Sequence, residues 1–259
     1  MLLKNKTVVI FAASGAIGSA FARKAAEEGA RLYVSARSAE PLRMLAEQLG
    51  ARHQIVDAMR EPEVDSWIDS IVEESGGIDV VLNPIGPRAA EAGYAQPCTT
   101  LSFEKFMLPL ELIAGSQFLT AKSAVRHMAP RGSGSILMLS ASLTGNFIPF
   151  MSGITAACGA VEGLARTLAA ELGPAGIRVN CVRAGGMPET RTIQETSARM
   201  AEAAGSGKEA ASRANTAGIL RRPLRLTEVA ASLVWLASDE ASGVAGQVIN
   251  VCAGTVVSR

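Results

Sequence analysis

Residues 7–18 read Thr-Val-Val-Ile-Phe-Ala-Ala-Ser-Gly-Ala-Ile-Gly and carry the clearest structural signal in the chain. The run begins with β-branched and apolar residues, which is typical of a buried strand. Two glycines, Gly15 and Gly18, follow directly and open a stretch rich in Ala and Glu with helical period. A strand that leads through a glycine turn into a helix is the first part of a βαβ unit.

The turn itself, residues 13–18, fits the dinucleotide-binding fingerprint, except that Ala13 stands at the first glycine position. In such turns the N–H groups of a helix N-terminus bind pyrophosphate, and missing side chains let the ligand approach closely. The alternative is a tight strand-to-helix turn without a ligand. Under the first interpretation the contacts come from Ser14, Gly15, Ile17 and Gly18.

The end of the next strand indicates which dinucleotide would bind. NAD sites usually carry an acidic residue about 20 positions after the glycine turn, on the ribose 2′-hydroxyl. Residues 35–38 instead read Ser-Ala-Arg-Ser. The Arg37 guanidinium can pair with a 2′-phosphate in a bidentate manner, and no carboxylate is there to repel it. The stretch favours NADP(H), unless Arg37 is simply a solvated loop residue.

The remaining sequence continues the alternation of short apolar runs with helical periods, which predicts an α/β fold with a parallel sheet. No linker or internal repeat divides it, so we expect one Rossmann-type doubly wound domain over residues 1–259. Strands are expected at Thr7–Ala12, Arg31–Ala36, His53–Asp57, Ile78–Asn83, Ser135–Ala141, Ile177–Arg183 and Gln247–Cys252. Helices are expected at Gly15–Glu28, Ala39–Leu49, Glu61–Glu74, Phe103–Met128, Ile154–Leu172 and Leu226–Ser238.

Two longer segments, residues 84–100 and 185–225, both follow strand ends, where open α/β sheets place their ligand crevice. The second is long enough to form a substrate loop or lid, and the alternative is an ordinary surface loop. Tyr94, in the first segment, is the tyrosine that could reach over the cleft.

Composition excludes several classes of protein. The formal net charge is +1, which gives no strong field for nucleic acid or an anionic membrane. No apolar run approaches the ~20 residues of a membrane span. The four cysteines are far apart and show no metal-ligand or disulfide spacing, so we expect no metal and a reducing cytoplasm.

Further stretches extend the pattern. They are Val-Asp at 56–57, Leu-Asn-Pro-Ile-Gly at 82–86, Leu-Ser-Ala-Ser at 139–142, Gly-Ile-Arg-Val-Asn at 176–180 and Gly-Gln-Val-Ile-Asn-Val at 246–251. Because these stretches occur in this order and at this spacing, the chain resembles the short-chain dehydrogenase/reductase family from end to end. The resemblance implies a small-molecule substrate and a homotetramer or homodimer built on the helices 103–128 and 154–172. It also implies cofactor contacts from Asp57, Asn83, Gly86, Gly185 and Met187.

The departures from the family pattern concern the cofactor loop first. Threonine and two glycines of the family loop correspond to Phe11, Ala12 and Ala16. Each added Cβ narrows the approach to phosphate, so NADP(H) is expected to bind weakly.

The family's catalytic residues are also changed. Its Tyr-x-x-x-Lys pair falls on Ile154 and Cys158, and its helix asparagine falls on Ile113. The catalytic serine is retained as Ser142, one residue closer to position 154 than is usual. Isoleucine cannot exchange a proton with substrate, and we interpret Cys158 as packing because no basic neighbour is near in sequence.

Three functions remain open. The first is an NADP(H)-dependent oxidoreductase with a non-standard active site, which the resemblance favours. The second is a non-redox enzyme, an isomerase, lyase or cyclase, that uses Ser142 and an apolar pocket. The third is a catalytically silent NADP(H)-binding or assembly protein, since fold does not determine function.

Overall fold

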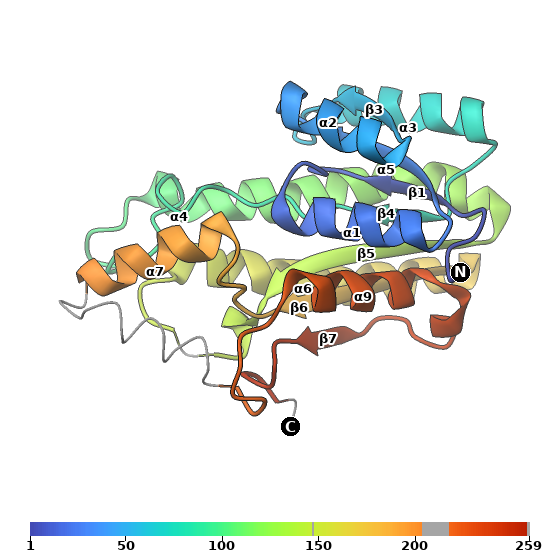
Figure 1. The fold of residues 1–259 in the computed structure, drawn as a ribbon. Coiled ribbons are helices and arrows are strands. Elements are labelled where there is room, and N and C mark those ends of the chain that lie inside the picture. The colour runs from blue at the N-terminus through green and yellow to red at the C-terminus, as the bar shows by residue number, and fades with distance from the viewer. Residues whose placement is uncertain (147, 204–217, 258–259) are drawn as a thin grey trace.

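A seven-stranded parallel sheet forms the centre of the protein in the computed structural model, which describes residues 1–146, 148–203 and 218–257 (Figure 1). The strand order is β3-β2-β1-β4-β5-β6-β7. The strands are β1 Thr7–Ile10, β2 Arg31–Ala36, β3 Arg52–Ile55, β4 Val80–Leu82, β5 Gly134–Ala141, β6 Ile177–Ala184 and β7 Val248–Val251. The prediction of a Rossmann-type α/β domain is confirmed.

Helices cover both faces of the sheet (Figure 1). Those of the described residues are α1 Ala16–Glu27, α2 Ala39–Leu49, α3 Glu61–Ser75, α4 Phe103–Pro109, α5 Ser116–Arg131, α6 Ser152–Leu172, α7 Arg191–Ala203 and α9 Leu226–Ala237. One hydrophobic core lies between the sheet and α1, α2 and α9, and the other lies between the sheet and α3, α5 and α6. None of these helices is long and apolar enough to cross a membrane.

The alternation of side chains in β1 explains the two cores. Val8 and Ile10 belong to the core under α1, whereas Val9 and Phe11 belong to the core under α3. All four are buried because helices lie on both sides of the sheet. Phe11, which the sequence analysis aligned with a threonine of the family pattern, therefore acts as a core side chain.

The chain reverses its direction of winding at the centre of the sheet. It proceeds outward from β1 to β3, then returns to place β4 on the other side of β1 and continues to β7. β1 and β4 remain paired up to their last residues, Ile10 and Leu82, and the segments that follow them lead to opposite sides of the sheet order. This is a topological switch point, where such sheets bind their ligands.

Two elements differ from the sequence-based expectation. The predicted helix Phe103–Met128 is interrupted by a π-helical turn, Leu110–Gly115, between α4 and α5. Pro109 ends α4, because proline lacks the N–H that would continue the regular hydrogen-bond pattern. The predicted lid, residues 185–225, contains a regular helix, α7, rather than only loop, and residues 204–217 of it lie outside the described residues.

Candidate active site

A cavity of about 980 Å³ lies at the carboxyl ends of the strands. Its walls come from the segments that follow the strands, from α6 and from α7. The predicted site residues that line it are Ser14, Gly15, Ile17, Gly18, Arg37, Asp57, Gly86, Ile113, Ser142, Ile154, Cys158, Gly185 and Met187. The structure thus brings nearly all of the predicted site together around one space.

The N-terminus of α1 opens onto this cavity. Gly18 packs against the turn so closely that a Cβ there would lie 2.6 Å from the Ala12 carbonyl oxygen. Ala12 has φ +47°, in the left-handed region that favours glycine. The first N–H groups of a helix have no acceptor within it. Those of α1 are therefore free to bind an anion such as a diphosphate.

The N-terminus of α1 and the segments after β2 and β3 form one half of the cavity, the cofactor half. The part of this half that follows β2 and β3 is polar. Arg37 is exposed, directly follows β2 and has no ion-pair or hydrogen-bond partner among the described residues. Asp57 follows β3, and its carboxylate accepts a hydrogen bond of 3.1 Å from the Met59 N–H. Its own N–H donates to the Glu63 carboxylate at 2.9 Å. The Asp57 carboxylate is therefore held in place at the edge of the cavity.

Asn83 is placed differently from the other predicted cofactor residues. Its amide nitrogen donates to the Ser116 and Thr120 hydroxyls at 3.1 and 3.3 Å, and its oxygen accepts from the Ile85 N–H at 3.0 Å. The side chain is buried and ties the end of β4 to α5 rather than lining the cavity. Nearby Gly86 does line it, and a Cβ there would meet nothing within 4 Å.

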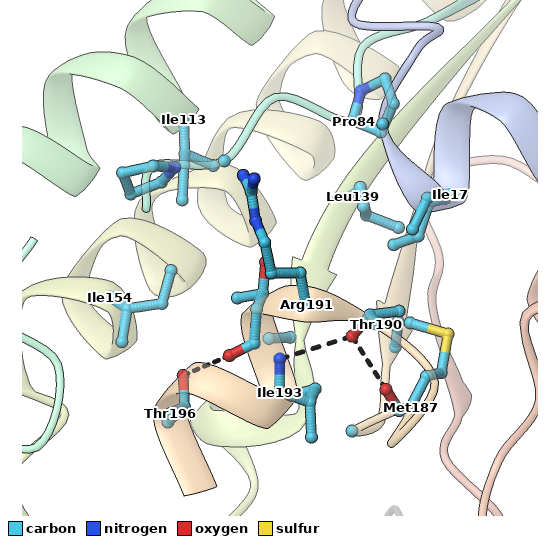
Figure 2. Close-up of a pocket in the computed structure, with 18 of the residues that line it drawn as sticks. Ile17, Pro84, Ile113, Leu139, Ile154, Met187, Thr190, Arg191, Ile193 and Thr196 are labelled. Carbon is cyan, nitrogen blue, oxygen red and sulfur yellow. Dashed lines mark hydrogen bonds between the residues drawn. The ribbon is translucent and has the colours of Figure 1, made fainter. Parts of the chain in front are cut away.

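The other half of the cavity is apolar at the three positions that the sequence analysis aligned with the family's polar groups. Ile113 lies on the π-helical turn, and Ile154 and Cys158 lie one turn apart on α6. Figure 2 shows Ile113 and Ile154 on separate helices at the cavity wall. All three side chains are buried in one hydrophobic cluster with Met151. The wall therefore offers packing, and its one polar hydrogen at these positions is the weakly donating thiol of Cys158.

The Cys158 thiol and the Ser142 hydroxyl lie close to this wall. Cys158 Sγ accepts a hydrogen bond of 3.3 Å from the Ala141 N–H. Burial raises the pKa of this thiol to about 11, so it stays protonated near neutral pH. Ser142 begins a short turn after β5, and its hydroxyl has no hydrogen-bond partner among the described residues.

A polar network behind the apolar wall was missed by the sequence-based prediction. Glu162, one turn beyond Cys158 on α6, forms a salt bridge with Arg183 of β6, at 2.6 Å. The Ser140 and Thr144 hydroxyls also donate to Glu162, at 2.9 and 2.7 Å. Burial opposes ionisation, but these donors outweigh it and lower the pKa of the carboxyl. The sequence does carry a signal for this pair, because an acidic residue of the helix, Glu162, and a basic residue of the strand, Arg183, both fall at positions that face the protein interior.

Helix α7 adds a second set of residues that sequence analysis did not single out. Thr190 caps its N-terminus, since its hydroxyl accepts from the Ile193 N–H at 3.4 Å and donates to the Met187 carbonyl at 2.8 Å. The next residue, Arg191, extends across the cavity toward Ile113 (Figure 2). Its guanidinium also lies 3.4 Å from the Glu195 carboxylate. This arginine gives the apolar half a cationic hydrogen-bond donor.

Comparisons of the sequence show what the chain is similar to. A family model described as enoyl-(acyl carrier protein) reductase matches residues 11–256. Momilactone A synthase from Oryza sativa subsp. japonica is 31% identical, over 98% of this chain and 91% of that protein. Tropinone reductase-like 1 from Erythroxylum coca is 31% identical, over 94% of this chain and 88% of its own length.

Solved structures agree with the sequence matches at the level of the fold. NAD⁺-bound xylitol dehydrogenase superposes with a TM-score of 0.91 at 23% identity, over 98% of this chain and 100% of the other. Levodione reductase gives a TM-score of 0.88 at 24% identity, over 97% of both chains. With these matches spanning almost its whole length, the chain belongs to the short-chain dehydrogenase/reductase family of oxidoreductases.

Proposed function

We propose that the protein is an NADP(H)-dependent oxidoreductase that interconverts a carbonyl and an alcohol on a small, largely apolar molecule. The observation that carries the proposal is the single cavity that joins the N-terminus of α1 and Arg37 to the apolar wall around Ile154. When bound, a nicotinamide cofactor supplies or accepts the hydride.

The residues of the cofactor half fit an extended dinucleotide. The first N–H groups of α1 would hold the pyrophosphate, and Arg37 would pair with the 2′-phosphate. Asp57 would lie at the adenine, while Gly86, where a Cβ would meet nothing within 4 Å, leaves room on the nicotinamide side. The xylitol dehydrogenase neighbour, which holds NAD⁺, supports a nicotinamide cofactor in this fold but does not choose between the two dinucleotides.

The substrate half orients its ligand and excludes water. Ile113, Ile154 and Met151 form a wall that packs an apolar substrate against the cofactor side, and Arg191 can hydrogen-bond a polar group on it. Hydride transfer requires mainly that donor and acceptor carbons be held in line. The wall does that work without the tyrosine and lysine of the family pattern, and a proton must come from elsewhere.

A second function, a silent NADP(H)-binding protein, is favoured by a different observation. The three apolar replacements are mutually consistent, since a lone tyrosine or lysine there would be a buried polar group without its partner. The protonated state of Cys158 likewise removes it as a nucleophile. Under this function the cavity binds cofactor but turns nothing over.

We also propose a homo-oligomer that is built on α5 and α6. Gly159 and Gly163 lie one turn apart on α6, and a Cβ added to either would meet nothing within 4 Å. A helix face of this kind lets a second helix approach closely. Phe118 on α5 is 44% exposed and adds apolar area. Sedimentation equilibrium that shows only monomer would contradict this assembly.

Calorimetric titration with NADPH and NADH, followed by an assay of NADPH oxidation with a panel of ketones and aldehydes, tests the proposal. We expect NADPH to bind more tightly and at least one ketone to be reduced. Equal affinities for the two cofactors would contradict the NADP(H) preference. Tight NADPH binding with no turnover of any carbonyl compound would instead support the silent function.

A further inference from the structure

Tyr94 is a buried phenol that the family pattern does not use. It lies in the segment between β4 and α4, lines the cavity and is 5% exposed. It belongs to the same hydrophobic cluster as Ile113, Ile154 and Cys158. Tyr94 is thus the one tyrosine among the described residues that line the cavity. It shares its hydrophobic cluster with the three positions that were aligned with the family's polar groups.

The backbone around Tyr94 holds this ring inward. Gly93 and Ala95, on either side of it, both have φ +63°, in the left-handed region. At Gly93 this conformation favours glycine, and an added Cβ would also displace the end of the Leu101 side chain. For Ala95 this conformation costs roughly 1–2 kcal/mol. The Tyr94 N–H donates to the Ala89 carbonyl at 3.1 Å and closes the turn.

The surroundings of the phenol keep it protonated and available. Its hydroxyl makes no hydrogen bond to any of the described residues. Burial raises the pKa of Tyr94, and the nearby Cys158 thiol raises it further. A neutral phenol with a free O–H is a hydrogen-bond donor for a carbonyl oxygen.

We propose that Tyr94 is the proton donor of the reaction and replaces, from a different segment of the chain, the tyrosine that the family carries at position 154. The inference rests on the proposed function. In carbonyl reduction the hydride from NADPH forms the new C–H bond and the cofactor is oxidised to NADP⁺. The C=O π electrons take the proton from the Tyr94 hydroxyl to form the alcohol, and water then reprotonates the tyrosinate.

Tyr94→Phe tests the inference because it removes only the hydroxyl. General acid catalysis is typically worth ~10²–10⁴-fold, so kcat for the best ketone of the panel should fall by that factor while NADPH affinity is unchanged. Tyr33→Phe is the matched control. Tyr33 is the other of the two tyrosines in the chain, is also buried, meets Trp67 edge-on and does not line the cavity. It should leave kcat unchanged.

A spectroscopic readout separates this inference from the proposed function. In the Tyr33→Phe variant, a ¹³Cζ label on tyrosine reports Tyr94 alone. Acetophenone, added with NADP⁺ so that no turnover occurs, should shift this signal as the hydroxyl donates to the ketone. A shift without any turnover in the NADPH assay would overturn the oxidoreductase function but keep Tyr94 as the carbonyl-binding donor. An unmoved signal, or full activity in Tyr94→Phe, would overturn the inference itself.

Discussion

The two halves of the cavity depart from the family pattern to different degrees. In the cofactor half, the sequence analysis aligns Ala12 and Ala16 with glycines of the family, and the structure shows the N-terminus of α1 open to the cavity and Gly18 packed on the turn. In the substrate half, the sequence analysis aligns Ile113, Ile154 and Cys158 with three polar residues of the family, and the structure shows these three side chains buried in one hydrophobic cluster.

The physical reason lies in which atoms do the work. Pyrophosphate binding depends on backbone N–H groups and a helix dipole, which survive changes of side chain as long as the turn keeps its shape. Proton transfer depends on particular side-chain atoms, which disappear with the residue. A chain can therefore keep the cofactor half of such a site and rebuild the substrate half.

Restoring the polar groups should produce the largest effect. In a Tyr94→Phe background, the combination Ile154→Tyr, Cys158→Lys and Ile113→Asn should increase ketone reduction by ~10²–10⁴-fold, measured as NADPH oxidation. The tyrosine, lysine and asparagine side chains introduced together can hydrogen-bond with one another, so none of them is a buried polar group without a partner. Cys158→Lys alone should instead lower the melting temperature, because it buries an ammonium without a partner. No gain in the folded combination would mean that position 154 does not face the substrate.

The next effect concerns the network behind the apolar wall. Glu162→Ala leaves the Arg183 guanidinium without its salt bridge in a mostly buried site. This should lower the free energy of unfolding by about 3 kcal/mol, as measured by urea denaturation. The double variant Glu162→Leu with Arg183→Leu is the control and should recover most of the loss. A single variant as stable as the unmodified protein would show that the pair is effectively solvated.

The same pair predicts a pH dependence. The pKa of Glu162 is lower in the folded protein than in the unfolded chain, because burial is outweighed by the hydrogen bonds from Arg183, Thr144 and Ser140. Its contribution to stability is therefore complete above the unfolded pKa of about 4.3 and is lost as pH falls through the lower folded value. Urea denaturation from pH 7 to pH 3 should show a smaller decrease in Glu162→Gln than in the unmodified protein.

Arg37→Ala should have a smaller effect, confined to the cofactor half. Loss of one charge-assisted phosphate contact is worth about 1.5–3 kcal/mol, so NADPH affinity should fall roughly ten- to hundredfold while NADH affinity changes little. Calorimetric titration measures the affinities for both NADPH and NADH. Replacement of Arg88, another arginine that lines the cavity, is the matched control and should preserve the difference. An unaltered preference in Arg37→Ala would show that the arginine is only solvated.

The smallest effect is expected in the glycine turn. Ala12→Gly removes a Cβ from a residue at φ +47° and should stabilise the fold by roughly 1 kcal/mol. Ala16→Gly places glycine in the first turn of α1 and should cost up to ~1 kcal/mol. Together they should tighten NADPH binding with little net change in melting temperature. Unchanged affinity in the folded double variant would show that the turn already fits its ligand.

Much of this fold was predictable because local patterns and the sheet agree. Buried parallel strands and glycine-ended helices have strong periodic signals, so the predicted strands and most of their boundaries agree with the structure. The break of the long helix at Pro109 was missed, since a proline can kink a helix or end it according to its packing. Helix α7 was missed because its segment was judged by its place after β6 rather than by its helix-forming residues.

The sequence by itself determined the Rossmann-type class, the glycine turn and the place of Arg37 after the second strand, because each depends on neighbours in sequence. Only the tertiary structure decided that the Asn83 side chain forms hydrogen bonds with α5 instead of lining the cavity, and that Glu162 forms a salt bridge with Arg183. It alone also placed Tyr94 beside Cys158. These are contacts between distant segments, which no local pattern encodes, and they arise when helices and strands pack on one another.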